Sequence, residues 1–129
     1  MRNITAGMVK AFYEGYTKSN GNTRVYEDKG YWCMSLHGNW IARRPVSGRG
    51  YVEVSCAGWP TVTTKERLRG ICLCRGAAVW QHKGVWLFTS QLEPGVEQVF
   101  DLNGWNKIAF VGTEIDRLVH ELAEEVSDA

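Results

Sequence analysis

Apolar side chains near the start of the chain recur at helical spacing. Residues three and four positions apart share one face of a helix, and such spacing joins Val9, Phe12, Tyr13 and Tyr16. The hydroxyl of Thr5 precedes them as a candidate N-cap. We therefore expect a helix over residues 5–16, followed by a loop over 17–22 because Asn20-Gly21 is a turn-forming pair.

The acidic end of the chain carries a longer helical pattern. Its apolar residues follow the spacing i, i+3, i+4, i+7 and i+11: Ile115, Leu118, Val119, Leu122 and Val126. Thr113 and Asp116 stand three residues apart at the start of this pattern, as in a variant capping box. The sequence therefore predicts an amphipathic helix over residues 113–127, whose apolar stripe packs on a sheet.

Between these segments the hydrophobic positions change to the short, alternating runs that are typical of strands. Turn-forming residues at Lys29-Gly30 and His37-Gly38 separate the first three runs, and a loop precedes the fourth. The runs are rich in β-branched and aromatic residues and cover 23–28, 31–37, 40–44 and 51–56. This order predicts a four-stranded antiparallel meander.

Two further hairpins are expected in the second half of the chain. One turns at Gly84 and the other at Asn103-Gly104, and the strands they join cover 77–83, 85–90, 97–102 and 105–111. The whole pattern predicts one α+β domain over residues 1–129. Its antiparallel sheet is built from hairpins and has about six to eight strands, with a short capped helix in the middle and helices at both termini.

The stretch AGWPTVTTKERLRGI, residues 57–71, interrupts the strands. Thr63 and Glu66 have the S/T-x-x-E spacing of a capping box, in which each side chain accepts a hydrogen bond from the other residue's backbone N–H. Gly70 is a natural stop, because glycine readily adopts the left-handed conformation that ends helices. We expect a short helix over 64–69 with Leu68 facing the core.

Charge divides the chain into two parts, although the whole carries only +1. Residues 1–92 hold 13 basic and 5 acidic side chains, a net charge of +8, whereas residues 93–129 hold 2 and 9, a net charge of −7. Such asymmetry is typical of a nucleic-acid surface on the basic part. The alternative is that the acidic C-terminal segment packs beside the basic body and neutralises it.

Composition also narrows the class of protein. No run of about 18 apolar residues could span a membrane, and the N-terminus lacks the apolar segment of a secretory signal. We therefore expect an intracellular protein with reduced thiols and no membrane partner. Six Trp, five Tyr and four Phe are many for 129 residues, and this surplus favours a binding surface.

The sequence lacks the common catalytic and metal-binding patterns. Cys72 and Cys74 are one residue apart, with no second such pair and only scattered histidines, so we expect no metal site. On a strand these two thiols would point to one face, and Cys33 and Cys56 are single. No nucleophile-elbow, metalloprotease or phosphate-loop motif occurs. We expect a protein that is not an enzyme and uses no cofactor.

Basic side chains with an aromatic neighbour form the candidate binding site. They lie on the third predicted strand and its loop, and on or beside the middle helix: Arg43, Arg44, Arg49, Trp59, Lys65, Arg67 and Arg69. Arginine and lysine neutralise phosphates and tryptophan stacks on unpaired bases, so the group fits nucleic acid or an acidic protein. On the helix only Lys65 and Arg69 share one side. The alternative is a solvated charged surface.

Four segments of the chain, taken together, resemble a family of small proteins encoded mainly by bacteriophages. These are NTRV, LHGNWIARR, AGWPTVTTKERLRGI and VWQHKGVWLF, at 22–25, 36–44, 57–71 and 79–88. The TTKERL block is the specific part, and Arg69 stands where the family pattern tends to have Asn. The resemblance spans about residues 22–106, leaves both terminal helices outside, and carries over no catalytic residue.

The resemblance implies a context, because small phage proteins of this kind are often accessory factors that act by binding. Our first hypothesis is a non-enzymatic protein in the host cytoplasm that binds and inhibits a host protein complex, as an anti-CRISPR factor does. The second is a nucleic-acid-binding module that uses the basic and aromatic residues above. The third is a small-molecule or nucleotide-signal binder with a tryptophan-lined pocket. A homodimer fits each hypothesis, because strands can pair across protomers.

Overall fold

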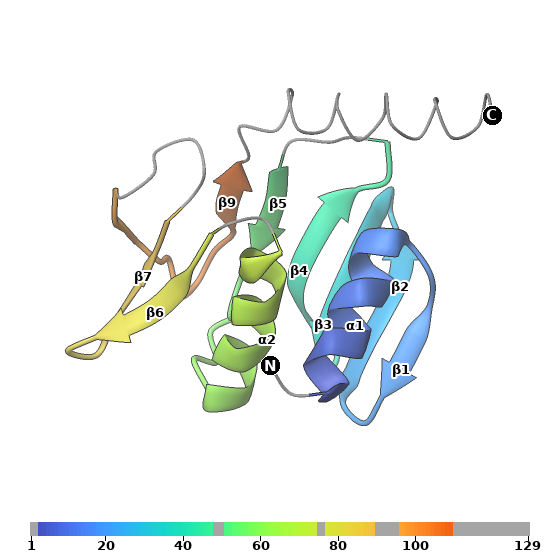
Figure 1. Cartoon of the computed structure of the whole chain (residues 1–129), viewed down its shortest axis with the longest axis horizontal. Helices are drawn as coiled ribbons and strands as arrows, with labels where there is room; N and C mark the ends of the chain where they lie inside the picture. Colours follow the sequence, from blue (N-terminus) through green and yellow to red (C-terminus); the bar gives the residue numbers. More distant parts are fainter. Residues whose placement is uncertain (1–2, 48–50, 75–76, 90–95, 110–129) are drawn as a thin grey trace.

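The computed structural model describes residues 3–47, 51–74, 77–89 and 96–109, in which two helices and nine strands are formed (Figure 1). An antiparallel sheet of six strands has the order β1-β2-β3-β4-β5-β9, and a separate sheet of three has the order β6-β7-β8. The α+β class and the antiparallel pairing are thus confirmed, but the strands form two sheets. The predicted C-terminal helix lies outside the described residues.

The first half of the chain is a helix followed by a meander. Helix α1 (Asn3–Glu14) precedes the strands β1 (Lys18–Asn20), β2 (Thr23–Asp28), β3 (Tyr31–Leu36), β4 (Asn39–Pro45) and β5 (Tyr51–Val54). Each strand pairs with the next one, so the predicted four-stranded meander is confirmed. The loop predicted at 17–22 is wrong, because its polar residues form the short edge strand β1, where exposed polar side chains are favoured.

The turns of the hairpins follow from local chemistry. Lys29-Gly30, His37-Gly38 and Lys83-Gly84 each have positive φ at both residues, between 49° and 82°. Two-residue hairpin turns of this kind match the right-handed twist of the strands that they join, and glycine adopts them without strain. Short-range sequence therefore determines where these strands reverse.

Helix α1 is displaced from the predicted range 5–16. Thr5 is not its N-cap but lies fully buried in the first turn. Gly15 ends the helix with φ at +83°, and its N–H donates to the carbonyl of Ala11 at 2.9 Å. The left-handed conformation of Gly15 prevents the helix from continuing to Tyr16.

Helix α2 (Val62–Leu73) is twice as long as predicted. Its N-cap is Thr61 rather than Thr63, since the Thr61 hydroxyl accepts a hydrogen bond from the N–H of Thr64 at 3.1 Å. The predicted stop at Gly70 is also wrong. The next residue, Ile71, is fully buried, and this burial outweighs the roughly 1 kcal/mol by which glycine disfavours a helix interior.

The predicted hairpin around Gly84 is confirmed, and the one around Asn103-Gly104 is not. Strands β6 (Val79–His82) and β7 (Val85–Phe88) pair as expected, but β8 (Gln98–Val99) joins β7 and β9 (Asn106–Ala109) joins β5. The Asn106 side chain explains the divergence. It accepts from the N–H of Asp101 at 2.7 Å and donates to the carbonyl of Val54 at 3.2 Å, so it attaches β9 to β5.

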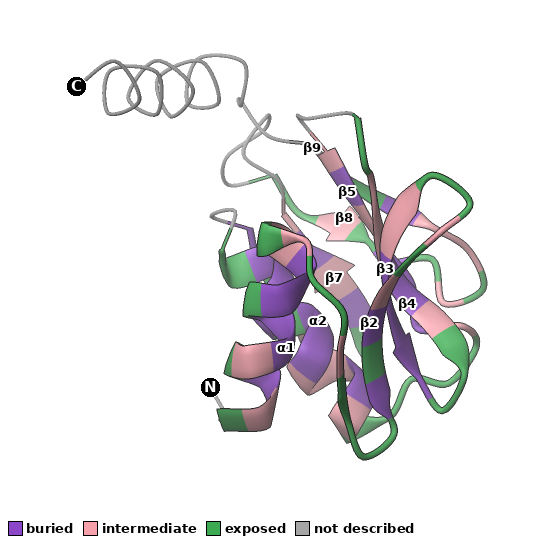
Figure 2. Cartoon of the chain, turned by 90° about the vertical axis from the view of Figure 1, so that its right-hand side faces the viewer, coloured by how far each residue is buried: buried purple, intermediate pink, exposed green. Residues whose placement is uncertain are grey.

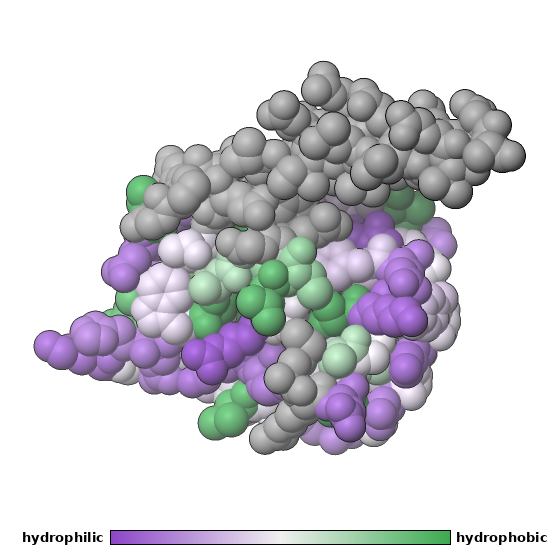
Figure 3. Space-filling model, in the orientation of Figure 1, coloured by the Kyte–Doolittle hydropathy of each residue, from purple (hydrophilic) through white to green (hydrophobic). Residues whose placement is uncertain are grey.

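Both helices lie on one side of the six-stranded sheet (Figure 2). The apolar core fills the space between the helices and the sheet. It contains fully buried residues of both layers: Met8, Phe12, Val25, Met34, Ala42, Val52, Leu68, Ile71 and Ile108. Figure 3 views this helix-covered side, where hydrophobic residues gather near the upper end of α2. The described residues place no helix on the opposite side of the sheet, which we call the outer face.

Candidate functional site

Aromatic and charged side chains gather on the outer face. Side chains alternate along a strand, and those that point away from the helices are Arg24, Tyr26, Asp28, Tyr31, Trp40, Arg43, Tyr51, Glu53 and Lys107, with Trp105 just before β9. The strand register aligns several of them in one row across five strands: Tyr26, Cys33, Arg43, Glu53 and Lys107. The outer face is therefore a continuous surface.

Arg43 lies at the centre of the outer face. Its guanidinium carbon is 4.1 Å from the ring centroid of Trp105 and 4.9 Å from that of Tyr31. Its Nε donates to Oε1 of Glu53 at 3.2 Å, across neighbouring strands. Cation–π contacts and a charge-assisted hydrogen bond thus hold this long side chain in one position.

The aromatic rings around Arg43 are also held by neighbours. The indole N–H of Trp40 donates to the Tyr26 hydroxyl at 2.7 Å, and the Arg24 guanidinium carbon lies 5.0 Å from the Tyr26 centroid. At the other end of the sheet, the Lys107 ammonium nitrogen is 4.2 Å from the centroid of Tyr51. Side chains ordered before binding lose less conformational entropy in a complex, so the outer face is pre-organised.

Cys33 shows how closely these side chains pack. It lies in the row between Tyr26 and Arg43, yet its exposed fraction is 0%. Burial, with a smaller contribution from the negative charge of Asp28, raises the pKa of its thiol to about 11. The thiol therefore stays protonated at neutral pH and is a poor nucleophile.

The other cysteines are arranged differently from the prediction. Cys72 and Cys74 do not share a face of a strand, because Cys72 is buried inside α2 and Cys74 is the exposed C-cap of that helix. Burial raises the pKa of Cys72 to about 12, with a smaller contribution from Cys74, and burial also raises the pKa of Cys56. Within the described ranges, no three His, Cys, Asp or Glu residues lie close enough to hold a metal ion.

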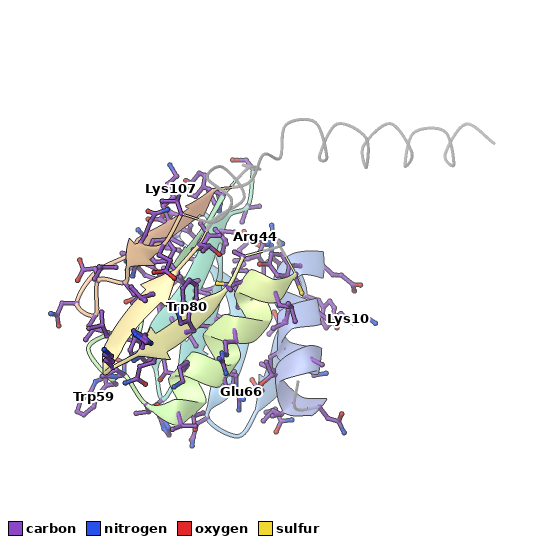
Figure 4. All side chains as sticks on the ribbon, turned by 60° about the vertical axis from the view of Figure 1, so that its left-hand side comes forward. Lys10, Arg44, Trp59, Glu66, Trp80 and Lys107 are labelled. Carbon is purple, nitrogen blue, oxygen red and sulfur yellow. The ribbon has the colours of Figure 1, made fainter. Side chains whose placement is uncertain are left out.

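The seven residues predicted to form a binding site do not share one surface. Arg43 belongs to the outer face, whereas Arg44 points to the helix side, where its Nε donates to the carbonyl of Phe12 at 2.8 Å. Arg49 lies outside the described residues. Figure 4 shows Arg44 and Trp59 at distant parts of the molecule.

The basic residues of α2 contact neighbouring elements of the fold. Arg67 is only 5% exposed, and it donates to the hydroxyl of Thr5 at 2.6 Å and forms an ion pair with Glu66. Lys65 and Arg69 share one side of α2, as predicted, and both contact β6. Lys65 donates to the side chain of Gln81 at 3.2 Å and Arg69 to the carbonyl of Val79 at 3.1 Å.

Trp59 is the remaining predicted site residue. It precedes α2, is 66% exposed, and lines a pocket of about 480 Å³ with His37 and Asn39. Sequence reasoning identified Trp59 but missed the outer face. The signal was present, because period-two alternation in 23–28 puts Arg24 and Tyr26 on one face, but the face becomes a cluster only through pairing across strands.

Together these features define a two-layer α+β protein with helices on one side of its main sheet and a pre-organised aromatic and charged cluster on the other. The model of the Kyanoviridae Gp96 protein family matches residues 1–115, and the chain belongs to this family of phage proteins. The match includes α1, which the sequence resemblance had left outside. No curated protein and no solved structure matches the chain. In the described part, no helix has the length and apolarity to cross a membrane.

Proposed function

We propose that this phage protein is a non-enzymatic accessory factor that binds a host protein through its outer face. The observation that supports the proposal is the pre-organised cluster around Arg43, Tyr31 and Trp105. Arginine, tyrosine and tryptophan are the residue types that contribute most to the energy of protein interfaces. Their ordered side chains reduce the entropy loss that accompanies association.

The charges of the outer face favour a protein over nucleic acid. Among the described residues of this face, three cationic side chains accompany the carboxylates of Asp28 and Glu53, and the charge of Arg43 is already paired with Glu53. Affinity for nucleic acid comes largely from cations that neutralise phosphates, and such cations are few among these side chains. The rings of Tyr26 and Tyr51 already contact cations, which compete with stacking on bases.

The cations and rings of the outer face also indicate which side chains a partner would present to it. Arg24 and Lys107 are exposed and belong to the two outer strands of the row, β2 and β9. A matching host protein would present apolar side chains to the central rings and carboxylates to these two cations. We further propose that binding occurs in the host cytoplasm and blocks the partner, as expected of a phage factor directed against a host defence complex.

Capture from host lysate, with and without nuclease, tests this function. The bait is the full chain, and the test variant combines Tyr31→Ala with Trp105→Ala. Lys10→Ala, on exposed residue 10 of α1, is the control for the helix side. We expect a stoichiometric protein that survives nuclease, is retained by the control and is lost by the double variant.

Two results would contradict the proposal. Equal capture by the double variant would exclude the outer face as the binding surface, provided that the variant melts as a folded protein. Loss of the captured protein after nuclease treatment would favour nucleic acid instead. The inhibitory role needs its own measurement: the protein should raise phage yield in a host with an active defence system, and the double variant should not.

A further inference from the structure

A pocket lies where the β3–β4 turn meets the loop that leads into α2. Its volume is about 480 Å³, within the range of small-molecule sites. Leu36, Ile41 and Cys56 are buried and form an apolar floor. None of the described residues that line it belongs to the outer face, so the pocket is a separate feature of the molecule.

The rim of the pocket is polar and carries an exposed tryptophan. His37, Asn39 and Thr61 supply hydrogen-bonding groups, and Trp59 is 66% exposed. Figure 4 shows Trp59 at the edge of the molecule, away from Trp80 on β6. No ring or cation contact of Trp59 occurs among the described side chains, so its indole face is open for stacking.

The loop holds Trp59 in place through its backbone. Ala57 and Gly58 have φ of +53° and +78°, and the N–H of Gly58 donates to the carbonyl of Leu102 at 3.0 Å. The N–H of Trp59 donates to the carbonyl of Cys56, and that of Thr61 to the carbonyl of Trp59, both at 2.8 Å. A large apolar side chain is thus presented to solvent by an ordered loop, as in a pre-formed binding site.

The lining of the pocket limits the chemistry of a ligand. The described residues that line it include no Lys, Arg, Asp or Glu. A charged ligand such as a phosphate ester would find no Lys or Arg side chain to pair with among them. An apolar floor, a stacking indole and neutral hydrogen-bonding groups suit a planar ring with a polar edge.

We infer that this pocket binds an uncharged heteroaromatic compound of nucleoside size. Its ring stacks on Trp59 above the apolar floor, and Asn39 and His37 form hydrogen bonds with its polar edge. This site is independent of the proposed protein interface, so either can be tested without the other.

Titration of the ¹⁵N-labelled full chain with adenosine, guanosine, cytidine and thymidine tests the inference by NMR. At least one nucleoside should change the chemical shifts of the Trp59 indole N–H and of the Ala57 and Thr61 amides, and these changes should saturate as its concentration rises. Trp59→Ala should weaken that binding about ten- to a hundredfold, because stacking on an aromatic residue contributes that much to base binding. Asn39→Ala should weaken it less, and Val62→Ala, an exposed neighbour outside the lining, should leave it unchanged.

Three results would overturn the inference. One is the absence of saturable shifts with all four nucleosides at concentrations up to about 10 mM. A Kd above that concentration would be far weaker than ordinary ligand binding. Another is unchanged affinity in both Trp59→Ala and Asn39→Ala, with amide spectra that show a folded protein. The third is tighter binding of adenosine monophosphate than of adenosine by more than about tenfold, since that would identify a charged ligand.

Discussion

The two sides of the six-stranded sheet use the same kinds of side chain in opposite ways. Arg43 and Arg44 are adjacent in β4 and therefore point to opposite sides. Arg44 reaches α1 and donates to the carbonyls of Phe12 and Tyr13 at 2.8 and 3.2 Å. Arg43 stacks between two rings on the outer face. Adjacent basic residues in a sequence thus need not belong to one binding surface.

On the helix side, a buried cation links several elements of the fold. Arg67 donates to the hydroxyls of Thr5 and Thr23 and pairs with Glu66, so it connects α2 with α1 and β2. Its hydrogen bonds are satisfied within the fold, whereas the outer face keeps its cations at the surface. The helix-side arginines therefore stabilise the fold, whereas the outer-face cations remain accessible to a partner.

Arg67→Met should have the largest effect on stability. The substitution keeps much of the volume but removes the ion pair with Glu66 and the hydrogen bonds to the hydroxyls of Thr5 and Thr23, so we expect the free energy of unfolding to fall by about 3 kcal/mol. Urea denaturation followed by circular dichroism measures this change. Lys10→Met, at an exposed position of α1, is the matched control and should change stability by less than about 0.5 kcal/mol. An equally small effect of Arg67→Met would remove the distinction between the two sides.

Local chemistry in the sequence predicted the turns and the meander, because Lys29-Gly30 and His37-Gly38 determine their own backbone conformation. It did not predict the burial of Arg67, which depends on a threonine 62 residues away. It also assigned β9 to the wrong neighbour, since the bonds of Asn106 to Val54 span 52 residues. The basic residues were recognised, but which side of the sheet each one faces follows from tertiary packing.

Arg44→Ala should have the second largest effect. The cation lies at the C-terminal end of α1, where it satisfies carbonyl groups and opposes the negative end of the helix dipole. We expect stability to fall by about 1–2 kcal/mol. Hydrogen exchange should show the loss first in the last turn of α1. Uniform loss of protection across the molecule would contradict a local capping role.

Alkaline pH should lower the stability of the protein through buried thiols on both sides of the sheet. The pKa is raised to about 11 for Cys33 on the outer face and to about 12 for Cys72 on the helix side, from 9.0 in each case. The unfolded chain therefore releases these protons first, and stability is lost as pH rises above about 9. Each thiol should contribute a slope of about 1.4 kcal/mol per pH unit while the two states differ by one proton.

Cysteine variants separate the contributions of the two sides. Denaturation between pH 8 and pH 10 should show a smaller decrease in stability for Cys33→Ala and for Cys72→Ala than for the natural sequence. Cys74→Ala removes an exposed thiol instead and is the control for replacing a cysteine outside the core. Identical slopes in all four proteins would mean that other groups cause the alkaline loss.

Arg43→Ala should change stability least and partner binding most. Its ion pair with Glu53 is partly exposed, with side chains 23% and 19% accessible, so solvent screens the attraction and we expect a loss below about 1 kcal/mol. Removal of the guanidinium nevertheless leaves Tyr31 and Trp105 without the group that orders them. Capture of the host partner should therefore fall strongly with Arg43→Ala and persist with Arg44→Ala at a temperature where both variants are folded. If Arg44→Ala weakens capture as much as Arg43→Ala does, the outer face is not the surface that binds.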